Sequence, residues 1–150
     1  MTTTYSAAPA IGAPGQVFDT AADNIVITKI ATTAINFGEF VSFEDGDGIG
    51  HTPNAAGEIP GNNGGGVALI DGQKASGVGY EVGDAVKVLI KGRVIVANEE
   101  TLAMGDSLFV RYASGTTGVF RNDDPGSAAA AFARASVFQG GSANQAVISL

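Results

Sequence analysis

The chain has 150 residues, of which 45% are hydrophobic and 15% charged, with 22 glycines and a formal net charge of −7. This composition predicts one folded domain rich in turns, because it is too apolar for a disordered chain. The negative charge argues against nucleic acid or an anionic membrane as the partner. The absence of cysteine excludes disulfides, thiol catalysis and Cys-based zinc sites, and no apolar run reaches the length of about 18 residues that a membrane span needs.

Residues 1–16 are predicted to form an extended arm. The segment begins with a run of threonines and carries Pro9 and Pro14, whose rings favour extended backbone. The first residues, MTTTYSAAPAIGAPG, lack the positive start and the apolar core of a secretory signal. Because the chain has no cysteine, we expect it to fold in a reducing cytoplasm.

The first strand candidates after the arm are NIVITKI (24–30), FGEFVSFEDG (37–46) and GVALI (66–70). In the second of these, Val41 and Phe43 alternate with Ser42 and Glu44, so one face of the strand is apolar. A glycine followed by an acidic residue precedes that strand, and this pair is typical of a tight turn.

Two later stretches repeat the same pattern more clearly, VGDAVKVLIKG (82–92) and MGDSLFVRYASG (104–115). Glycine accepts a positive φ without steric cost and the acid can bond a nearby backbone N–H, so each copy predicts a turn that starts a half-buried strand. The alternation predicts buried side chains at Val86, Val88, Ile90, Leu108 and Val110. It predicts that Lys87, Lys91 and Arg111 reach solvent or a subunit interface.

Hairpins are predicted within both stretches. LIKGRVIV should turn at Lys91-Gly92, and FVRYASGTTGVF should form a hairpin with a longer loop. Further strands are expected at FARASVF (132–138) and QAVISL (145–150). AAAAFARA could instead begin a short helix, and the pattern alone does not separate the two.

The stretch 44–66 is the longest predicted loop, and loops of this length are usually functional or disordered. Asp45 and Asp47 resemble the start of a calcium loop, but Ile49 and Ala56 stand where ligands are needed, so we expect an acidic turn. GNNGGG lacks the Gly-Lys-Ser/Thr ending of a phosphate loop, and we interpret it as a flexible tip. His51, the single histidine, is predicted to be a solvated loop residue.

The adjacent carboxylates Glu99-Glu100 and Asp123-Asp124 are expected to point apart rather than to form an acid–base pair. The sequence therefore predicts no catalytic, cofactor-binding or metal-binding residue. It predicts an all-β fold, a small β-barrel or β-sandwich of short antiparallel strands with an extended N-terminal arm. Residues 17–150 would form a single β domain with the long Gly-rich loop at 44–66.

The order of these motifs resembles one known family. A threonine-rich start leads to Tyr5 and to Ala-Pro-Ala-x-x-Gly, then come INFGEFVSF, GYEVGDAVKVLIKGRVIV, MGDSLFVRYASGTTGVFR and an Ala/Gly-rich pair of terminal strands. This sequence is similar to the capsid cement (decoration) proteins of tailed bacteriophages over nearly its whole length. The long segment between residues 46 and 66 carries the least of the resemblance.

The resemblance implies a structural virion protein on the outer capsid surface, made in the cytoplasm of a host bacterium. Such a protein clamps neighbouring subunits of the major capsid protein, is often a homotrimer or homodimer, and has no catalytic or cofactor residues. The arm could order on such a partner through contact area. Its candidate contact residues are Thr4, Tyr5, Pro9, Ile11 and Pro14.

Other interpretations remain open. The arm could be a plain tail or a strand of its own sheet, and for Tyr5 this alternative is equally good. A glycan- or receptor-binding β-module on the virion surface is the second function, but tryptophan is absent and 44–66 contains no aromatic residue. A small β-domain enzyme is the third, and the single histidine disfavours it.

Overall fold

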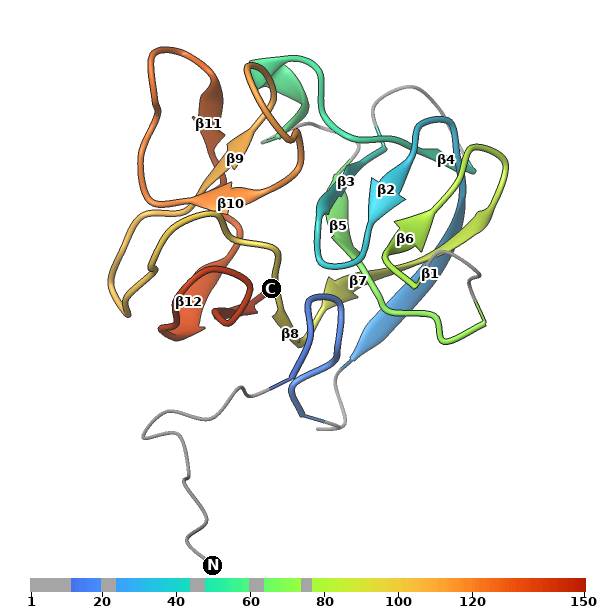
Figure 1. Cartoon of the computed structure of the whole chain (residues 1–150), viewed down its shortest axis with the longest axis horizontal. Helices are drawn as coiled ribbons and strands as arrows, with labels where there is room; N and C mark the ends of the chain where they lie inside the picture. Colours follow the sequence, from blue (N-terminus) through green and yellow to red (C-terminus); the bar gives the residue numbers. More distant parts are fainter. Residues whose placement is uncertain (1–11, 20–23, 44–47, 60–63, 74–76) are drawn as a thin grey trace, which may run out of the picture.

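The computed structural model describes residues 12–19, 24–43, 48–59, 64–73 and 77–150. The predicted all-β fold is confirmed, because these residues form thirteen short strands and one 3-10 turn, η1 (Ala56–Glu58). Within the same residues no helix is both long and apolar enough to cross a membrane. Figure 1 shows the strands gathered into two lobes.

The first lobe contains a five-stranded sheet in the order β3-β5-β7-β1-β4 and a two-stranded sheet, β2-β6. The strands of the larger sheet are β3 (Phe40–Ser42), β5 (Gly65–Ala68), β7 (Ala85–Lys91), β1 (Ile25–Ala31) and β4 (Ile49–Gly50). The smaller sheet consists of β2 (Ile35–Asn36) and β6 (Gly79–Tyr80). Together the two sheets form an incomplete barrel (Figure 1).

The second lobe contains two three-stranded sheets, β10-β9-β11 and β12-β13-β8. The first consists of β10 (Phe120–Arg121), β9 (Phe109–Arg111) and β11 (Ala129–Ala131). The second consists of β12 (Ser136–Gln139), β13 (Val147–Ser149) and β8 (Arg93–Ile95). The pairing within both is antiparallel, as expected, whereas β4 pairs with β1 in parallel.

The five-stranded sheet lies between two hydrophobic clusters. Phe40, Val67 and Leu89 stand opposite one another on β3, β5 and β7 and join a shared cluster with side chains of the second lobe. The side chains on the other face, including Val41 and Val88, join a barrel cluster inside the first lobe. The core of this sheet therefore has two apolar faces, which is why these strands contain so few polar residues.

Aromatic rings join the two lobes within the shared cluster. The ring of Phe132, which follows β11, lies edge-on to Phe40 of β3 with 5.1 Å between the centroids. The guanidinium of Arg134 donates to the carbonyl of Gly65 at the start of β5 (2.8 Å). Gly65 itself lies against the Phe40 ring, where a Cβ would collide, so a glycine is needed for this approach.

The predicted hairpins have different outcomes. The longer one is confirmed, because β9 and β10 pair antiparallel with Phe120 opposite Val110. The hairpin at Lys91-Gly92 is wrong: β7 pairs with β1 and β5, whereas β8 pairs with β13. Gly92 has a φ of 135° and redirects the chain from one lobe into the other, a change of sheet that the alternation of side chains does not reveal.

The predicted burial is largely confirmed, with two corrections. Val86, Val88, Leu108 and Val110 are buried, and Lys87 and Lys91 are exposed. Ile90 is only half-buried, because a bulge shifts the register between β1 and β7 beside it. Arg111 is buried at 8% exposure and does not reach solvent, for the electrostatic reason given below. AAAAFARA forms no helix, since β11 occupies Ala129–Ala131, and of the predicted strand 132–138 only the part from Ser136 onwards is a strand, because a turn lies at 133–134.

Replacing Val88 with Asp should be severe, because Val88 is fully buried in the barrel cluster and the new charge would have no partner. We expect a loss in unfolding free energy above about 4 kcal/mol. Lys87→Asp, the neighbour that faces the opposite side of β7, should cost less than about 1 kcal/mol. Chemical denaturation of both variants checks this, and equal stabilities would contradict the register.

Candidate binding surfaces

One type of turn occurs four times in the structure. In each copy a glycine with φ between 83° and 92° occupies the third position, as a type II turn requires. The backbone N–H of the fourth residue donates to the carbonyl of the first, and the side-chain oxygen of the fourth residue accepts from the N–H of the first. The four copies span residues 13–16, 36–39, 81–84 and 103–106, and we name them the Gln16, Glu39, Asp84 and Asp106 turns after the residue that closes each one.

The Gln16 and Glu39 turns pack against each other between the lobes. Gly15 lies so close to Phe37 that a Cβ added to it would stand 2.9 Å from the Cβ of Phe37. A Cβ added to Gly38 would stand 2.6 Å from the Cβ of Pro14. Phe37 is buried and its ring lies edge-on to Tyr80 of β6, with centroids 5.4 Å apart. The glycines of both turns, together with Phe37 and Glu39, are therefore part of the interior, whereas Ala13 and Gln16 are exposed.

The Gln16 turn fastens the arm root, residues 12–19, to both lobes. Gly15 donates its N–H to Ile95 of β8 (2.8 Å), and Ile95 donates to the carbonyl of Gln16 (3.0 Å). On the other side, Ile70 after β5 donates to the carbonyl of Gly15 (2.9 Å). The predicted arm of residues 1–16 is thus part of the folded body from residue 12 onwards.

The five predicted contact residues are divided by this boundary. Pro14 lies in the arm root, half-buried against Gly38. The other four, Thr4, Tyr5, Pro9 and Ile11, lie outside the described residues. Their role in partner binding stays a prediction.

The Asp84 and Asp106 turns project away from the body. A Cβ added to Gly83 or to Gly105 would meet nothing within 4 Å. The apolar residue at the second position, which is Phe37 in the Glu39 turn, is here Val82 or Met104, and these side chains are 68% and 74% exposed. Both Gly-Asp pairs were predicted from the sequence to form turns, but the exposed tips were not predicted. The sequence feature that marks each tip is an apolar residue directly before the glycine.

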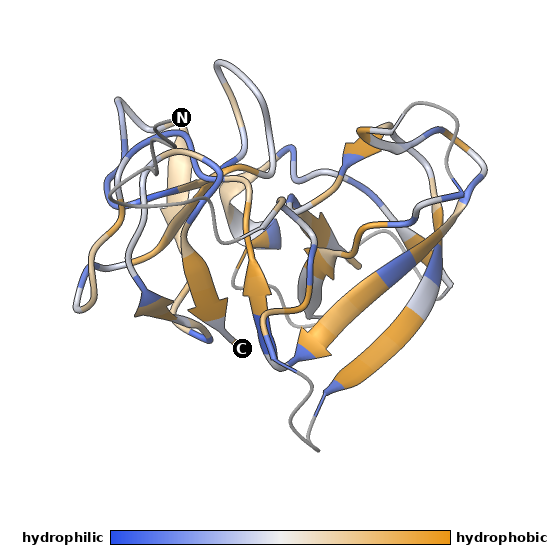
Figure 2. Ribbon diagram, turned by 60° about the horizontal axis from the view of Figure 1, so that its bottom comes forward, coloured by the Kyte–Doolittle hydropathy of each residue, from blue (hydrophilic) through white to orange (hydrophobic). Residues whose placement is uncertain are grey.

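A second exposed apolar surface lies on β1. Val26 and Ile30 are 47% and 45% exposed, and with Thr28 they face away from the barrel cluster. Figure 2 shows β1 and β7 as two long, mainly apolar strands along the outer side of the first lobe. Among the described residues, β1 pairs on its other edge only through Ile30 and Ala31, with β4, so the edge from Ile25 to Lys29 has no partner strand there.

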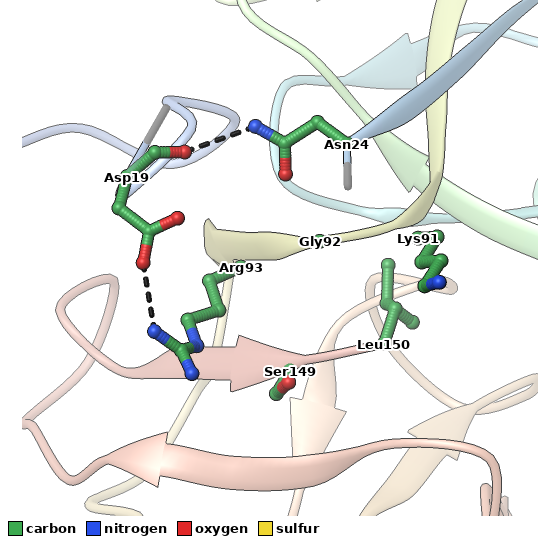
Figure 3. Close-up of a pocket in the computed structure, with 7 residues that line it drawn as sticks. All are labelled: Asp19, Asn24, Lys91, Gly92, Arg93, Ser149 and Leu150. Atoms are coloured by element: carbon green, nitrogen blue, oxygen red, sulfur yellow. Dashed lines mark hydrogen bonds and ion pairs between the residues drawn. The ribbon is translucent and has the colours of Figure 1, made fainter. Parts of the chain in front are cut away.

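A shallow pocket of about 200 Å³ lies where the arm root meets β1, β8 and the end of the chain. Figure 3 shows that Arg93 bonds Asp19 (2.8 Å), whose carbonyl accepts from the Asn24 side chain (3.0 Å). The Arg93 guanidinium also lies 4.0 Å above the ring of Phe138. The polar groups of the pocket thus bond one another and connect the segment before β1 to β8.

His51 is not the solvated loop residue that we expected. It is 1% exposed, because its backbone pairs with Ser42 of β3 through two hydrogen bonds and so places the ring inside the lobe. Its Nδ1 lies 2.8 Å from the carbonyl of Thr52 and 4.0 Å from Oε2 of Glu58. In the described part of the chain, no three His, Cys, Asp or Glu side chains are grouped so that they could hold a metal ion.

Glu99 and Glu100 do not point apart as expected, since both contact Arg121. Glu99 Oε1 accepts from Arg111 (2.9 Å) and from Arg121 (2.8 Å), which explains why Arg111 is buried. Burial alone would raise the pKa of Glu99, but the hydrogen bonds and charges of the two arginines outweigh it and lower the pKa. The cluster holds β9 and β10 to the preceding loop and is structural.

Glu39 is the one strongly buried carboxyl that the described residues contain, with 2% of its surface exposed. Its Oε1 accepts the N–H of Asn36 at 2.8 Å and so closes the turn. Burial raises its pKa from 4.5 to about 7, and the hydrogen bond from Asn36 opposes this only partly. The turn between β2 and β3 therefore contains a group that titrates near neutral pH.

Glu39 should make the protein less stable as pH rises. The folded state holds this proton more tightly than the unfolded chain, so the free energy of unfolding should fall between pH 4.5 and about 7, by roughly 3 kcal/mol at most. Glu39→Gln keeps an oxygen for the Asn36 N–H and removes the ionisation. Urea denaturation of both proteins from pH 4.5 to 8 should show a smaller fall for the variant, and parallel profiles would contradict the assignment.

The buried and projecting turns should respond differently to the same substitution. Gly38→Ala and Gly83→Ala impose similar strain, since φ is 83° and 92°, and that strain costs about 1–2 kcal/mol. Only the Gly38 variant also collides, with Pro14 at 2.6 Å and the Ala97 nitrogen at 2.8 Å. Thermal unfolding should therefore show a markedly larger loss for Gly38→Ala, and equal losses would mean that the junction does not pack as described.

The chain is similar to known proteins both in sequence and in fold. The family described as "Structural cement protein (E217 gp24/Pam3 gp6)" matches residues 1–150. A chain in the solved structure "The capsid of Myoviridae Phage XM1" has the same fold, with a TM-score of 0.73 and 16% identity, over 99% of this chain and 96% of that one. Among curated proteins none matches. The protein belongs to the family of phage structural cement proteins.

Proposed function

We propose that the protein binds the outer surface of a bacteriophage capsid and stabilises it by clamping neighbouring subunits of the major capsid protein. The observation that carries this proposal is the family match, which covers residues 1–150. The likeness in fold to a chain from a phage capsid structure is consistent with it. A clamp works through shape and contact area, so the proposal includes no enzymatic activity and no cofactor.

The exposed surfaces support a role in protein contact. The large hydrophobic side chains that are exposed on β1 and in the two projecting turns are aliphatic or methionine. Exposed aliphatic side chains and strand edges are typical of surfaces that bind another protein, whereas a glycan-binding module presents aromatic rings. The net charge of −7 favours a partner surface with basic groups over nucleic acid or an anionic membrane.

The arm is the first contact element in this proposal. Residues 12–19 are hydrogen-bonded at the junction of the two lobes, so the contacts that we propose for the arm would begin beside this junction. Thr4, Tyr5, Pro9 and Ile11 would then contact a capsid subunit, with Pro14 holding the base of the arm. Self-association as a homotrimer or homodimer would place several arms on one lattice site and raise their combined affinity. Synthesis would take place in the host bacterial cytoplasm.

Deleting residues 2–11 should weaken attachment to capsids without unfolding the body, because residues 12–19 hold the arm root to the body through their own hydrogen bonds. Co-sedimentation with undecorated capsids measures attachment, and thermal unfolding measures the body. Tyr5→Ala and Ile11→Ala in the full chain are the matched point variants. If the deleted and full-length proteins attach equally, the arm is not a contact element. If neither attaches, the cement function is wrong.

A further inference from the structure

We propose that Val82 and Met104, at the tips of the Asp84 and Asp106 turns, are two apolar anchors that insert into two different subunits of the capsid lattice. Each would seat in an apolar pocket bordered by basic side chains. The inference rests on the proposed cement function and adds to it the residues and the chemistry of the contact. It concerns only described residues and is independent of the arm.

The first support is a comparison within the chain. The same turn places an apolar residue at its second position in all four copies. Phe37 of the Glu39 turn is buried at 7% exposure and Pro14 of the Gln16 turn is half-buried, so these copies use that residue for internal packing. Val82 and Met104 are the two most exposed large hydrophobic residues among those described. Val82 and Met104 have no such internal packing, and the surface of a partner would supply the apolar contact instead.

The second support is that both tips are already held in one shape. In the Asp84 turn, Asp84 donates its N–H to the Glu81 carbonyl (3.0 Å), and its carboxylate accepts from the Glu81 N–H (2.8 Å). The Asp106 turn is closed in the same way, at 3.1 Å and 2.9 Å. An anchor on a closed turn loses little conformational entropy on binding, which favours affinity. Because Gly83 and Gly105 stand clear of the body, a partner can approach the backbone closely.

The third support is the charge beside each tip, which defines the partner. Glu81 and Asp84 flank Val82, and Asp106 follows Met104 after one residue. The carboxylates of Asp84 and Asp106 close the two turns. A pocket with an apolar floor and a Lys or Arg rim complements both the apolar and the acidic part of such a tip. An acidic rim would repel it.

The fourth support is the separation of the tips. The Asp84 turn leads into β7 in the first lobe, and the Asp106 turn precedes β9 in the second. In Figure 1 the two turns lie at opposite sides of the molecule, the first at the right and the second at the far left. One pocket therefore cannot hold both. Two pockets are required, and we assign them to two neighbouring lattice subunits, which the protein would then bridge.

The test compares Val82→Ser, Met104→Ser and the double variant with the native protein in co-sedimentation with undecorated capsids. Each single variant should weaken attachment at least about tenfold, as expected for the loss of an interface anchor. Val82→Ile and Met104→Leu keep an apolar tip and should attach normally. Ile70→Ser, which removes an exposed apolar side chain outside both turns, is the matched control and should also attach normally.

A second measurement tests bridging separately from attachment. At saturating concentration, capsids that carry either single Ser variant should be disrupted by heat at the same temperature as undecorated capsids, whereas the native protein should raise that temperature. If the single variants stabilise the capsid as well as the native protein does, the two tips do not bridge subunits.

The remaining outcomes separate this inference from the cement function. If native protein and all Ser variants attach equally, the anchors are excluded and the cement function stands. If the native protein does not attach, both are excluded. If the Ser variants attach normally but change the oligomeric state in sedimentation velocity, the tips bind another copy of this chain, and the assignment to the capsid is wrong.

Discussion

The fold depends on one sheet that buries both of its faces where β3, β5 and β7 pair. The row formed by Phe40, Val67 and Leu89 belongs to the cluster shared with the second lobe, and the neighbouring side chains of the same strands belong to the barrel cluster. Neither lobe can move relative to the other without exposing one of these faces to water, which is costly. For a protein that acts by contact, this shared sheet keeps its two ends at a fixed separation.

The repeated turn has the same backbone geometry in two environments, packed between the lobes or projecting from the body. In all four copies a side-chain oxygen closes the turn, and this needs only an acceptor, not a charge. The projecting turns use aspartate for this acceptor. The Gln16 turn uses a neutral amide on an exposed side chain, and the Glu39 turn uses a buried carboxyl, whose pKa burial has raised to about 7. Only at Glu39 does burial act against the charge while the hydrogen bond is kept.

The strands and most of the buried residues could be predicted from the sequence because alternation and Gly-Asp pairs are local signals. Features that depend on contacts with distant segments could not be predicted. The alternation of side chains predicts that Arg111 points outward, yet its ion pair with Glu99 keeps it buried. At Gly92 the chain leaves one sheet and enters another. His51 lies in a loop by composition but pairs with Ser42 of β3. The exposed tips at Val82 and Met104 were not predicted because exposure is a property of the folded surface, not of the repeat.

Within the described residues, the edge of β1 from Ile25 to Lys29 has no partner strand, and this has a consequence for the free protein. The exposed Val26 and Ile30 lie on this strand, which makes it a template for edge-to-edge pairing between copies. The net charge of −7 opposes such encounters, but salt shortens the range of that repulsion to about 3 Å at 1 M. Colloidal stability should therefore decline as ionic strength rises, so the acidity of this chain also protects it before it reaches its partner.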